Sequence, residues 1–329
     1  MGRIPNLPTQ QPRVKITLVT PAPAQIHTGN RTTADRWARL LGELGNEVNV
    51  QQDWNEGGCD LLIALHARRS FPAVRRFREK YRRKPLIMAL TGTDVYGDLE
   101  QSPEAKCSLE LATRIVVLQE LAVEVLPKNA QGKARVIYQS AEPPVHSPPR
   151  VEGCFQVCVL AHLRTVKDPL RAAYAVRELP ASSRILVKHA GAALDPEFER
   201  EAESEQRKNP RYHWLGPLTH DNAVDLLARS HLLALTSTLE GGANVVSEAI
   251  AVGTPVISSL IPGSIGILGK DYPGYFPTGD SAALREQLHR SESDNGFYPH
   301  LQEQIARLQP LVSAAREREA WAALLNELG

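Results

Sequence analysis

The chain has 329 residues, 42% of them hydrophobic, which is enough for about two domains with buried cores. Lysine and arginine number 38 against 37 aspartate and glutamate, so the formal net charge of +1 gives no overall attraction to nucleic acid. No apolar run approaches the roughly 18 residues that span a membrane, and the opening MGRIPNLPTQQPR lacks the apolar core of a signal peptide. We therefore expect a cytoplasmic protein without a nucleic-acid partner.

The first half of the chain alternates short apolar runs with helical or polar segments. A β-rich run, VKITLVT, is followed by a segment in which Trp37, Leu40 and Leu41 recur at helical spacing before Gly45. The later apolar runs of this half are EVNV, DLLIAL, PLIMAL, RIVVL and ARVIY. Such alternation is typical of a parallel sheet flanked by helices. We predict an N-terminal Rossmann-like domain over residues 13–150.

A proline-rich segment separates this half from the next. SAEPPVHSPPRVEG, at 140–153, contains four prolines between two strand-like runs, as an interdomain linker would. The apolar runs that follow are FQVCVLAHL, SRILVKHAG, RYHWLG, HLLALTS and TPVISS. They predict a second Rossmann-like domain over residues 151–309. The chain ends in a predicted helix, at about 310–329, whose apolar stripe includes Trp321 and Leu324 and must pack on another element.

The segment ARRSFPAVRRFREKYRRKP carries nine basic residues against one glutamate. It suits either contact with anionic lipid or nucleic acid, or a solvated helix face. We favour the solvated face, because the run is short and lacks a strong apolar side.

The stretch EGGANVVSEAIAVGTPVI places Glu240 and Glu248 eight positions apart. The glycine pair after Glu240 lets backbone amides approach a ligand, because no Cβ stands in the way. A helix that begins near Asn244 would direct its free N–H groups and the positive end of its dipole at the same place, which suits a diphosphate. Glu248 can accept hydrogen bonds from the vicinal hydroxyls of a ribose. The alternative to a ligand site is that Glu240 is an ordinary acidic residue of a loop and Glu248 only stabilises the positive end of the helix dipole.

Several segments carry a family resemblance. EGGANVVSEAIAVGTPVI resembles the E-x7-E donor motif of the GT-B glycosyltransferases of family 4. LVTPAPAQIHTGNRTTADRWARLLGELGNEVNV is similar to that family's first strand, glycine loop and helix, and LTGTDVYGDL to its H-G-x-D segment, with Thr91 in place of histidine. LAHLRTVKDP is similar to its phosphate-binding R…K segment. The resemblance implies an α/β GT-B fold, with two Rossmann-like domains facing across a cleft and a C-terminal helix that crosses back to the N-terminal domain.

The same resemblance implies a division of labour, in which the C-terminal domain binds a UDP-sugar and the N-terminal domain presents the acceptor. Cations in the R…K segment would neutralise the charge that develops on the departing diphosphate. The implied catalytic residues are Glu240, Arg164 and Lys167. The implied donor-binding residues are Gly241, Gly242, Asn244, Val245, Glu248, Gly29 and Asn30. No metal or other cofactor is expected, because the cations and helix amides can replace a divalent ion.

A narrower resemblance concerns the acceptor. The combination of TPAP, HTGNRTTADRWARLL, GTDVYGDL, HLRTVKDPLRAA and LEGGANVVSEAI looks like the selenosugar synthases of bacterial selenoneine biosynthesis. Enzymes of that family join selenophosphate to the anomeric carbon of a UDP-sugar, UDP-N-acetylglucosamine in particular, forming a C–Se bond and releasing UDP. The resemblance implies these two small-molecule substrates. Thr91, in place of the usual histidine, leaves the sugar open, and retention and inversion at the anomeric carbon both remain open.

Selenophosphate needs little help from a general base, because its selenium is already a strong soft nucleophile. We therefore expect cationic or amide donors in the N-terminal half of the cleft. Arg31 is the first candidate, with a surface salt bridge as the alternative, and for each histidine the alternative is a structural role. The candidate acceptor-binding residues are Arg31, His27, His66, Thr91, Gly92 and Asp94.

Three other functions compete with this one. A family 4 transferase would take a hydroxyl acceptor on a sugar, lipid or small metabolite. A nucleotide-sugar epimerase on the same scaffold would consume a UDP-sugar without any acceptor. A UDP-sugar-binding protein would bind without releasing UDP. The sequence does not indicate an oligomeric state.

Overall fold

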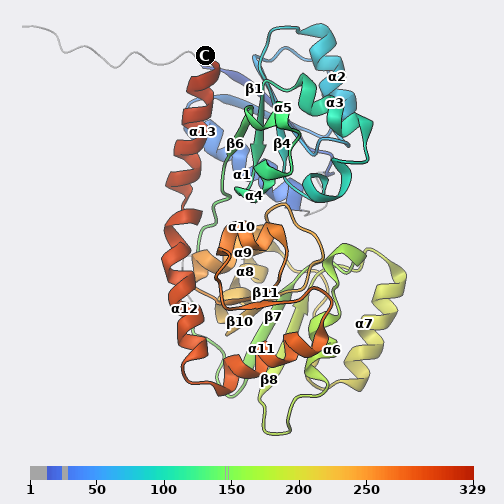
Figure 1. The fold of residues 1–329 in the computed structure, drawn as a ribbon, viewed down its shortest axis with the longest axis vertical. Coiled ribbons are helices and arrows are strands. Elements are labelled where there is room, and N and C mark those ends of the chain that lie inside the picture. Colours follow the sequence, from blue (N-terminus) through green and yellow to red (C-terminus); the bar gives the residue numbers. More distant parts are fainter. Residues whose placement is uncertain (1–12, 24–28, 145, 147) are drawn as a thin grey trace, which may run out of the picture.

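The computed structural model describes residues 13–23, 29–144, 146 and 148–329. Two α/β domains lie one above the other, and the last two long helices run along one side of both (Figure 1). Each domain holds a six-stranded sheet, and every strand pairing in these sheets is parallel. The predicted two-domain α/β architecture is confirmed.

The N-terminal sheet has the strand order β2-β1-β3-β4-β5-β6. Its strands are β1 Lys15–Val19, β2 Glu47–Gln51, β3 Leu61–Leu65, β4 Leu86–Leu90, β5 Arg114–Val117 and β6 Ala134–Val136. Its helices are α1 Gly29–Glu43, α2 Phe71–Lys80, α3 Pro103–Leu111, α4 Leu121–Glu124 and α5 Lys128–Gln131, with a π-helical turn at Asp94–Asp98. All residues of β3 and β4 are buried, as expected for central strands covered on both faces.

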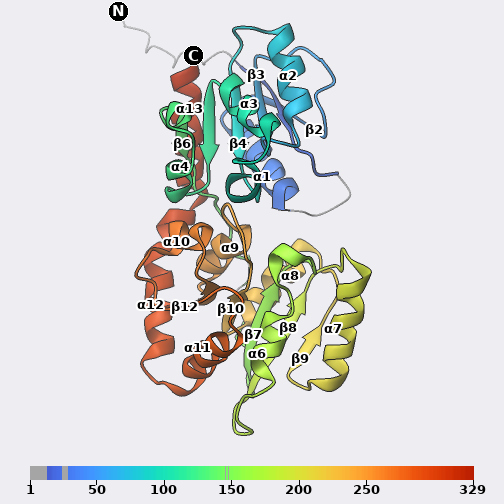
Figure 2. The ribbon, with the colours of Figure 1, turned by 45° about the vertical axis from the view of Figure 1, so that its right-hand side comes forward.

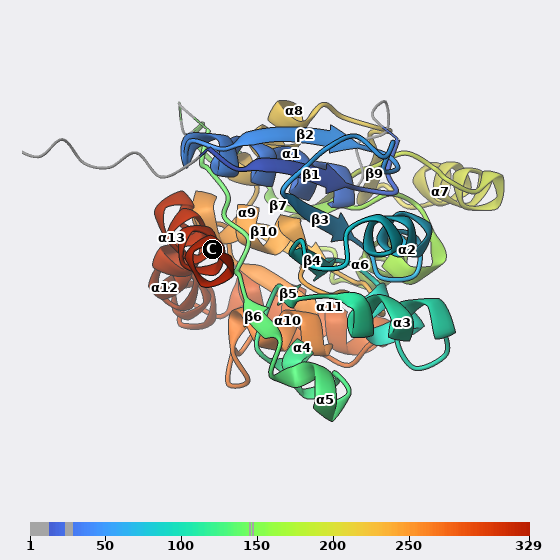
Figure 3. The ribbon, with the colours of Figure 1, turned by 90° about the horizontal axis from the view of Figure 1, so that it is seen from above.

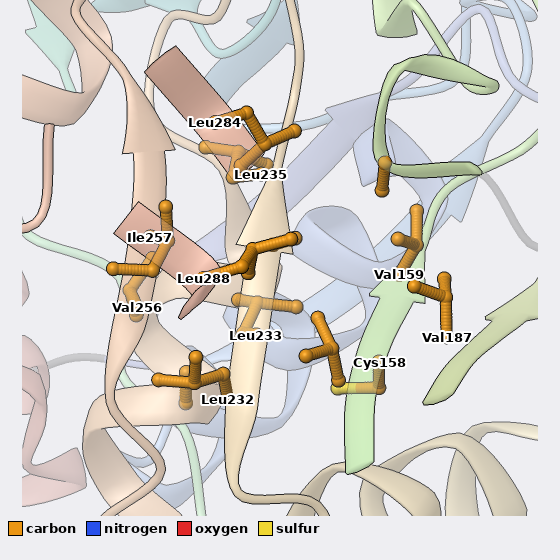
Figure 4. Close-up of a cluster of buried hydrophobic side chains, with 14 of the residues drawn as sticks. Cys158, Val159, Val187, Leu232, Leu233, Leu235, Val256, Ile257, Leu284 and Leu288 are labelled. Carbon is orange, nitrogen blue, oxygen red and sulfur yellow. The ribbon is translucent and has the colours of Figure 1, made fainter. Parts of the chain in front are cut away.

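The C-terminal sheet has the order β12-β11-β10-β7-β8-β9. Its strands are β7 Phe155–Leu160, β8 Ile185–Ala190, β9 Tyr212–Trp214, β10 Leu232–Leu235, β11 Val256–Ser259 and β12 Tyr275–Phe276. Its helices are α6 Arg171–Val176, α7 Pro196–Lys208, α8 His220–Arg229, α9 Asn244–Val252, α10 Pro262–Leu268, α11 Ser281–Ser293 and α12 Phe297–Leu308, with 3-10 turns at Thr165–Lys167 and Gln309–Val312. Leu284 and Leu288 of α11 are fully buried in the same core as β10 and β11 (Figure 4).

The two domains are joined by the segment between β6 and β7, in which the predicted boundary at residue 150 falls. The C-terminal helix α13, Ala314–Leu328, returns to the N-terminal domain and packs on α1. Trp321 of α13 and Trp37 of α1 meet edge to face, with ring centroids 4.8 Å apart. Seen from above, α12 and α13 lie together at one edge of the molecule (Figure 3). The predicted C-terminal stripe thus packs on the N-terminal domain.

The domains also touch directly. Helix α10 of the C-terminal domain packs against α4 of the N-terminal domain (Figure 2). Close by, the Tyr138 hydroxyl donates to the backbone oxygen of Gly266, at 3.4 Å. The two sheets are therefore held in one arrangement by contacts other than the linker.

The basic segment forms α2 and the turn after it, and the domain itself binds many of its cations. Arg76 forms an ion pair with Asp53 at 2.8 Å, and Lys84 forms one with Asp60 at 3.6 Å. The Arg78 guanidinium donates to the backbone oxygen of Leu111 at 2.8 Å. These contacts use cations that lipid or nucleic acid would otherwise bind, which favours the predicted solvated helix face. Among the described residues, no helix combines the length and the apolar character needed to cross a membrane.

Candidate active site

A cleft of about 370 Å³ opens between the two domains. Residues just beyond β1, β3, β4, β7 and β10 line it, so the carboxyl ends of both parallel sheets face the same space, as they do at ligand sites of α/β proteins. The N-terminal domain contributes Pro21, Ala22, Pro23, Gly29, Asn30, Thr32, His66, Arg69, Thr91, Gly92 and Thr93. The C-terminal domain contributes Leu160, Ala161, His162, Arg164, Lys167, Ala190, Gly191, Leu194, Pro217, Leu218, Ala223, Glu240, Gly242, Ala243, Asn244, Val245 and Glu248.

Glu240 and Lys167, two of the predicted catalytic residues, form an ion pair on the C-terminal wall of the cleft. The same oxygen of Glu240 accepts a hydrogen bond from the Ser237 hydroxyl at 2.6 Å, and Glu240 is only 8% exposed. The Thr236 hydroxyl donates to the backbone oxygen of Lys167 at 3.0 Å, which ties the turn after β7 to the end of β10. These contacts fix the Glu240 carboxylate at the wall and neutralise its charge.

Arg164, the third predicted catalytic residue, begins the turn that carries Lys167 and is exposed at the cleft. No described residue forms a hydrogen bond or an ion pair with its side chain. Its positive charge is therefore directed at the cleft without a protein carboxylate to offset it, which suits an anionic ligand.

The R…K turn is held close to β8. Gly191, just after β8, approaches the backbone beside this turn so closely that a Cβ there would stand 1.9 Å from the Ala161 oxygen. The same Ala161 oxygen lies 2.9 Å from Nε2 of His189, a ring that is fully buried. Burial lowers the pKa of His189 to about 4, so the ring is neutral at pH 7. Its hydrogen bond to the Ala161 oxygen therefore has a structural role.

Glu248 lies in the second turn of α9 and faces the same cleft, with its side chain 16% exposed. Burial raises its pKa, while the positive charges of His220 and Arg36 act in the opposite direction. The distance from Oε1 of Glu248 to Nδ1 of His220 is 3.9 Å. A carboxylate with a shifted pKa in a cleft is a typical feature of a binding or catalytic site.

Helix α9 stops at Gly253, whose φ of 72° places it in the left-handed region that ends helices. The Thr254 N–H then donates to the Ala249 oxygen at 2.8 Å, and β11 begins two residues later. This helix end explains the Gly-Thr-Pro sequence at 253–255, because it directs the chain from α9 into the neighbouring strand β11.

The glycine pair after Glu240 serves the domain interface, which corrects one of our predictions. A Cβ on Gly241 would stand 2.6 Å from the Gly92 oxygen, and a Cβ on Gly242 would stand 2.7 Å from the Leu118 Cβ. Both obstacles belong to the N-terminal domain. Gly242 also lines the cleft, but Gly241 does not. The absent side chains therefore let the two domains approach each other, and the predicted ligand contact of Gly241 has no support in the geometry.

Asn244 and Val245 open α9 at the cleft, as predicted, but the Asn244 side chain is committed to the N-terminal domain. Its Oδ1 accepts from the Arg36 guanidinium at 2.9 Å, and its amide donates to the Gly29 oxygen at 3.2 Å. Among its groups, the backbone N–H at the start of α9 is the one suited to a ligand.

Five of the predicted N-terminal residues come together at the cleft. They are Gly29, Asn30, His66, Thr91 and Gly92. The Thr91 hydroxyl donates to Oδ1 of Asn30 at 2.9 Å, which joins the start of α1 to the turn after β4. His27 lies outside the described residues.

Two predicted acceptor residues lie elsewhere. Arg31 does not line the cleft, and its guanidinium forms an ion pair with Asp35, one helical turn along α1, at 2.8 Å. Asp94 is fully buried, where its carboxylate accepts the N–H groups of Ala67 and Gly92, each at 3.0 Å. Asp94 therefore holds two loops together beneath the site. The interpretation of both residues as acceptor ligands is corrected, because their polar atoms are used within the N-terminal domain.

Arg69 also lines the cleft, although in the sequence it is one of nine basic residues in a single segment and matches no site motif. Its position four residues after the end of β3 was the available signal, since ligand sites of parallel sheets lie at the carboxyl ends of strands.

Comparison with known proteins agrees with this geometry. Residues 146–307 match the model of the family described as glycosyl transferases group 1, and this range includes Arg164, Lys167, Glu240 and Glu248. The match covers most of the C-terminal domain, and the chain is similar to that family over this range. A relative from Xenopus tropicalis, glycosyltransferase 1 domain-containing protein 1, is 24% identical over 284 residues, covering 75% of this chain and 79% of the relative.

Solved structures resemble the chain over both domains. HepE from Anabaena, solved in complex with UDP and glucose, has a TM-score of 0.73 and 16% identity, covering 96% of this chain and 100% of that one. Sucrose-phosphate synthase from Thermosynechococcus elongatus has a TM-score of 0.75 and 16% identity, covering 96% and 99%. At this identity the similarity concerns the fold, and it establishes the predicted GT-B fold.

Proposed function

We propose that this protein is a glycosyltransferase that uses a UDP-sugar, UDP-N-acetylglucosamine in particular, to glycosylate selenophosphate. The observation that carries the proposal is the convergence of Arg164, the Glu240–Lys167 pair and Glu248 on one cleft at the carboxyl ends of both sheets. These are the residue types that a nucleotide diphosphate sugar requires: cations for the phosphates and carboxylates for hydroxyl groups. The complex of HepE with UDP and glucose supports UDP as the nucleotide.

The donor would lie along the C-terminal wall. Glu248 would accept hydrogen bonds from the ribose, and Arg164 would contact the diphosphate, where its charge offsets the negative charge that grows as UDP leaves. Lys167 is already held beside Glu240, so the pair would sit between the phosphates and the sugar. We propose that these side chains and the first amides of α9 replace a divalent ion.

The chemistry of the N-terminal wall supports an acceptor that needs no general base. Among the described residues, the part of this wall that lines the cleft contains no aspartate or glutamate. A selenium atom that already carries negative charge can attack the anomeric carbon without losing a proton. In that step the C–Se bond forms while the bond between the anomeric carbon and the UDP oxygen breaks, and the electron pair leaves with the β-phosphate.

A hydroxyl acceptor is the second candidate, because His66 lines the same wall. Burial is the main cause that lowers its pKa, so the ring is neutral near pH 7 and able to accept a proton. The two candidates differ in acceptor chemistry, and a direct product measurement separates them.

The test is mass spectrometry of product and UDP after the protein is mixed with UDP-N-acetylglucosamine and freshly made selenophosphate. Phosphate, thiophosphate and buffer alone replace selenophosphate in the control reactions. We expect selenophosphate-dependent UDP release together with a selenium-bearing sugar. UDP binding without turnover would reject the selenium assignment and direct the search to hydroxyl acceptors, and consumption of the UDP-sugar in buffer alone would indicate an epimerase or a hydrolase.

A further inference from the structure

The loop between β3 and α2 is held in one conformation at the edge of the cleft. His66, directly after β3, has a φ of 71°, in the left-handed region that residues with a side chain rarely adopt. Its N–H donates to the Ala89 oxygen at 2.9 Å, and its own oxygen accepts from the Ser70 N–H at 3.0 Å. The Ser70 hydroxyl donates to the Leu65 oxygen at 2.5 Å. A strained backbone that is held at both ends presents its side chains in a fixed place, as functional loops do.

Two neighbouring arginines of this loop have different environments. Arg68 forms an ion pair with Asp98 at 2.9 Å and does not line the cleft. Arg69 does line the cleft, its side chain is exposed, and no described residue forms a hydrogen bond or an ion pair with its guanidinium. The same backbone thus directs one cation to a carboxylate of its own domain and the next cation to the cleft.

The His66 side chain, which also lines this wall, adds no negative charge to it. The His66 ring is buried beneath the loop, with Nε2 3.7 Å from Oδ2 of Asp98, and its Nδ1 accepts the Arg69 N–H at 3.5 Å. Burial is the main cause that lowers the pKa of His66; the charges of Asp94 and Asp98 oppose this shift, and those of Arg69 and Arg68 add to it. Among the described residues of this wall that line the cleft there is no aspartate or glutamate, so none there competes with a ligand for the Arg69 guanidinium.

The two walls of the cleft carry one unneutralised arginine each among the described residues. Arg164 belongs to the C-terminal wall and lies where the proposed function places the donor diphosphate. Lys167 is already paired with Glu240. Arg69 belongs to the opposite wall, so a second anion that enters the cleft beside a bound diphosphate meets Arg69.

We propose that Arg69 is the residue that binds the anionic group of the acceptor, and that this group is a small tetrahedral oxyanion such as the phosphoryl group of selenophosphate. The planar guanidinium can donate two parallel hydrogen bonds to such a group, with the strength of charge-assisted bonds. The acceptor assignment rests on the proposed function, whereas the oxyanion site rests on the loop itself.

Steady-state kinetics tests the residue within the proposed reaction. Arg69→Ala should raise KM for selenophosphate by roughly 10- to 100-fold, the loss of a charge-assisted pair, while KM for the UDP-sugar changes by less than about threefold. Arg69→Lys should recover part of the loss, because the charge returns without the two parallel bonds. Arg68→Ala is the matched control and should leave both KM values unchanged. Equal increases in the two KM values for Arg69→Ala would overturn the proposal.

A binding measurement separates this proposal from the selenium assignment. Thiophosphate is titrated by calorimetry into the protein saturated with UDP, using wild type, Arg69→Ala and Arg68→Ala. We expect binding to wild type and Arg68→Ala and a loss of at least tenfold in affinity for Arg69→Ala, whether or not selenophosphate is turned over. Equal affinity in all three proteins, or no binding to wild type, would reject the oxyanion site.

Discussion

Arg36 of α1 and Glu317 of α13 form an ion pair at the domain interface, with 3.1 Å between Nε and Oε2. Glu317 is 1% exposed, although it is charged and lies 281 positions along the chain from its partner. The carboxylate also accepts from the Trp37 indole N–H at 2.7 Å and from the Ser140 N–H at 2.8 Å. One buried carboxylate thereby joins the first helix, the interdomain segment and the last helix.

The same arginine reaches the site. Its guanidinium donates to Oδ1 of Asn244 at 2.9 Å, and the neighbouring Gln139 amide donates to the Gly242 oxygen at 2.8 Å. The start of α9 and the loop before it are therefore held against the N-terminal domain by a network that reaches Glu317. A buried polar network with satisfied partners specifies one arrangement of the elements it joins.

Removing Glu317 should weaken the whole molecule. We expect Glu317→Ala to lower the free energy of unfolding by about 3–5 kcal/mol, because the partly buried Arg36 guanidinium and the buried Trp37 N–H lose their shared acceptor. Urea unfolding measures this loss. Glu319→Ala changes an exposed glutamate of the same helix and should leave stability within about 0.5 kcal/mol of wild type. Similar midpoints for the two variants would contradict a stabilising role for the network.

Replacing Glu240 should separate catalysis from nucleotide binding. Glu240→Gln should lower kcat by roughly 100-fold or more, because a neutral amide neither holds Lys167 in an ion pair nor places a negative charge beside the sugar. UDP should bind at least as tightly as to wild type, since Lys167 is released toward the phosphates. Calorimetry with UDP and initial rates measure the two effects, with the exposed Glu199→Gln of α7 as control. Unchanged kcat with weaker UDP binding would show that Glu240 only shapes the phosphate site.

Donor binding should depend on the ionisation of Glu248. Because burial raises the pKa of this carboxyl, the negative form that accepts hydrogen bonds from the ribose is lost, on acidification, at a higher pH than for an ordinary glutamate. We expect KM for the donor to rise as the pH falls through this raised pKa. Glu248→Gln should raise KM at pH 7 and remove this pH dependence. A pH profile of donor KM that is identical in the two proteins would assign the titration to another group.

The same raised pKa has a consequence for stability. Between the unfolded-state pKa and the raised folded-state pKa, the folded protein binds more protons, so its stability falls as the pH rises through this window. Above the window the buried charge remains a cost, which Glu248→Gln removes. We expect this variant to melt at a higher temperature than wild type at pH 7, and scanning calorimetry at that pH checks the sign.

The contact between Gly241 and Gly92 should limit how far the domains close. Gly241→Ala places a Cβ 2.6 Å from the Gly92 oxygen, and because that obstacle is backbone of the other domain, the domains must separate. We expect a larger radius of gyration in small-angle X-ray scattering and a kcat reduced by about tenfold or more, because the two walls no longer meet the reactants together. Gly132→Ala, where a Cβ meets no atom within 4 Å, is the control. An unchanged radius of gyration in Gly241→Ala would exclude such a limit.

The reaction should not depend on a divalent ion. Arg164, Lys167 and the first amides of α9 offer the positive charge that a departing diphosphate needs. We expect turnover to persist in EDTA after extensive dialysis, with UDP release as the readout. Loss of turnover that magnesium restores would place a metal in the mechanism.

Sequence patterns alone predicted the fold class, the order of the two domains and the residue types on the C-terminal wall of the cleft. Apolar periodicity is a local property, so the alternation of strands and helices could be predicted before any contact was known. The resemblance to the R…K and E-x7-E motifs implied Arg164, Lys167, Glu240 and Glu248 as site residues. The carboxyl ends of parallel strands lie at the same edge of a sheet. The four side chains follow such ends or open the helix after one, so they line one cleft.

The contacts of the remaining side chains depend on tertiary structure. Arg31 is held by Asp35 and Asp94 is turned inward to two backbone N–H groups, whereas Arg69, one of nine basic residues in a segment, is the one that lines the cleft. Gly241 is required by the backbone of the other domain. Each of these outcomes depends on which groups from distant parts of the chain come within a few ångströms, and no local pattern in the sequence encodes that distance.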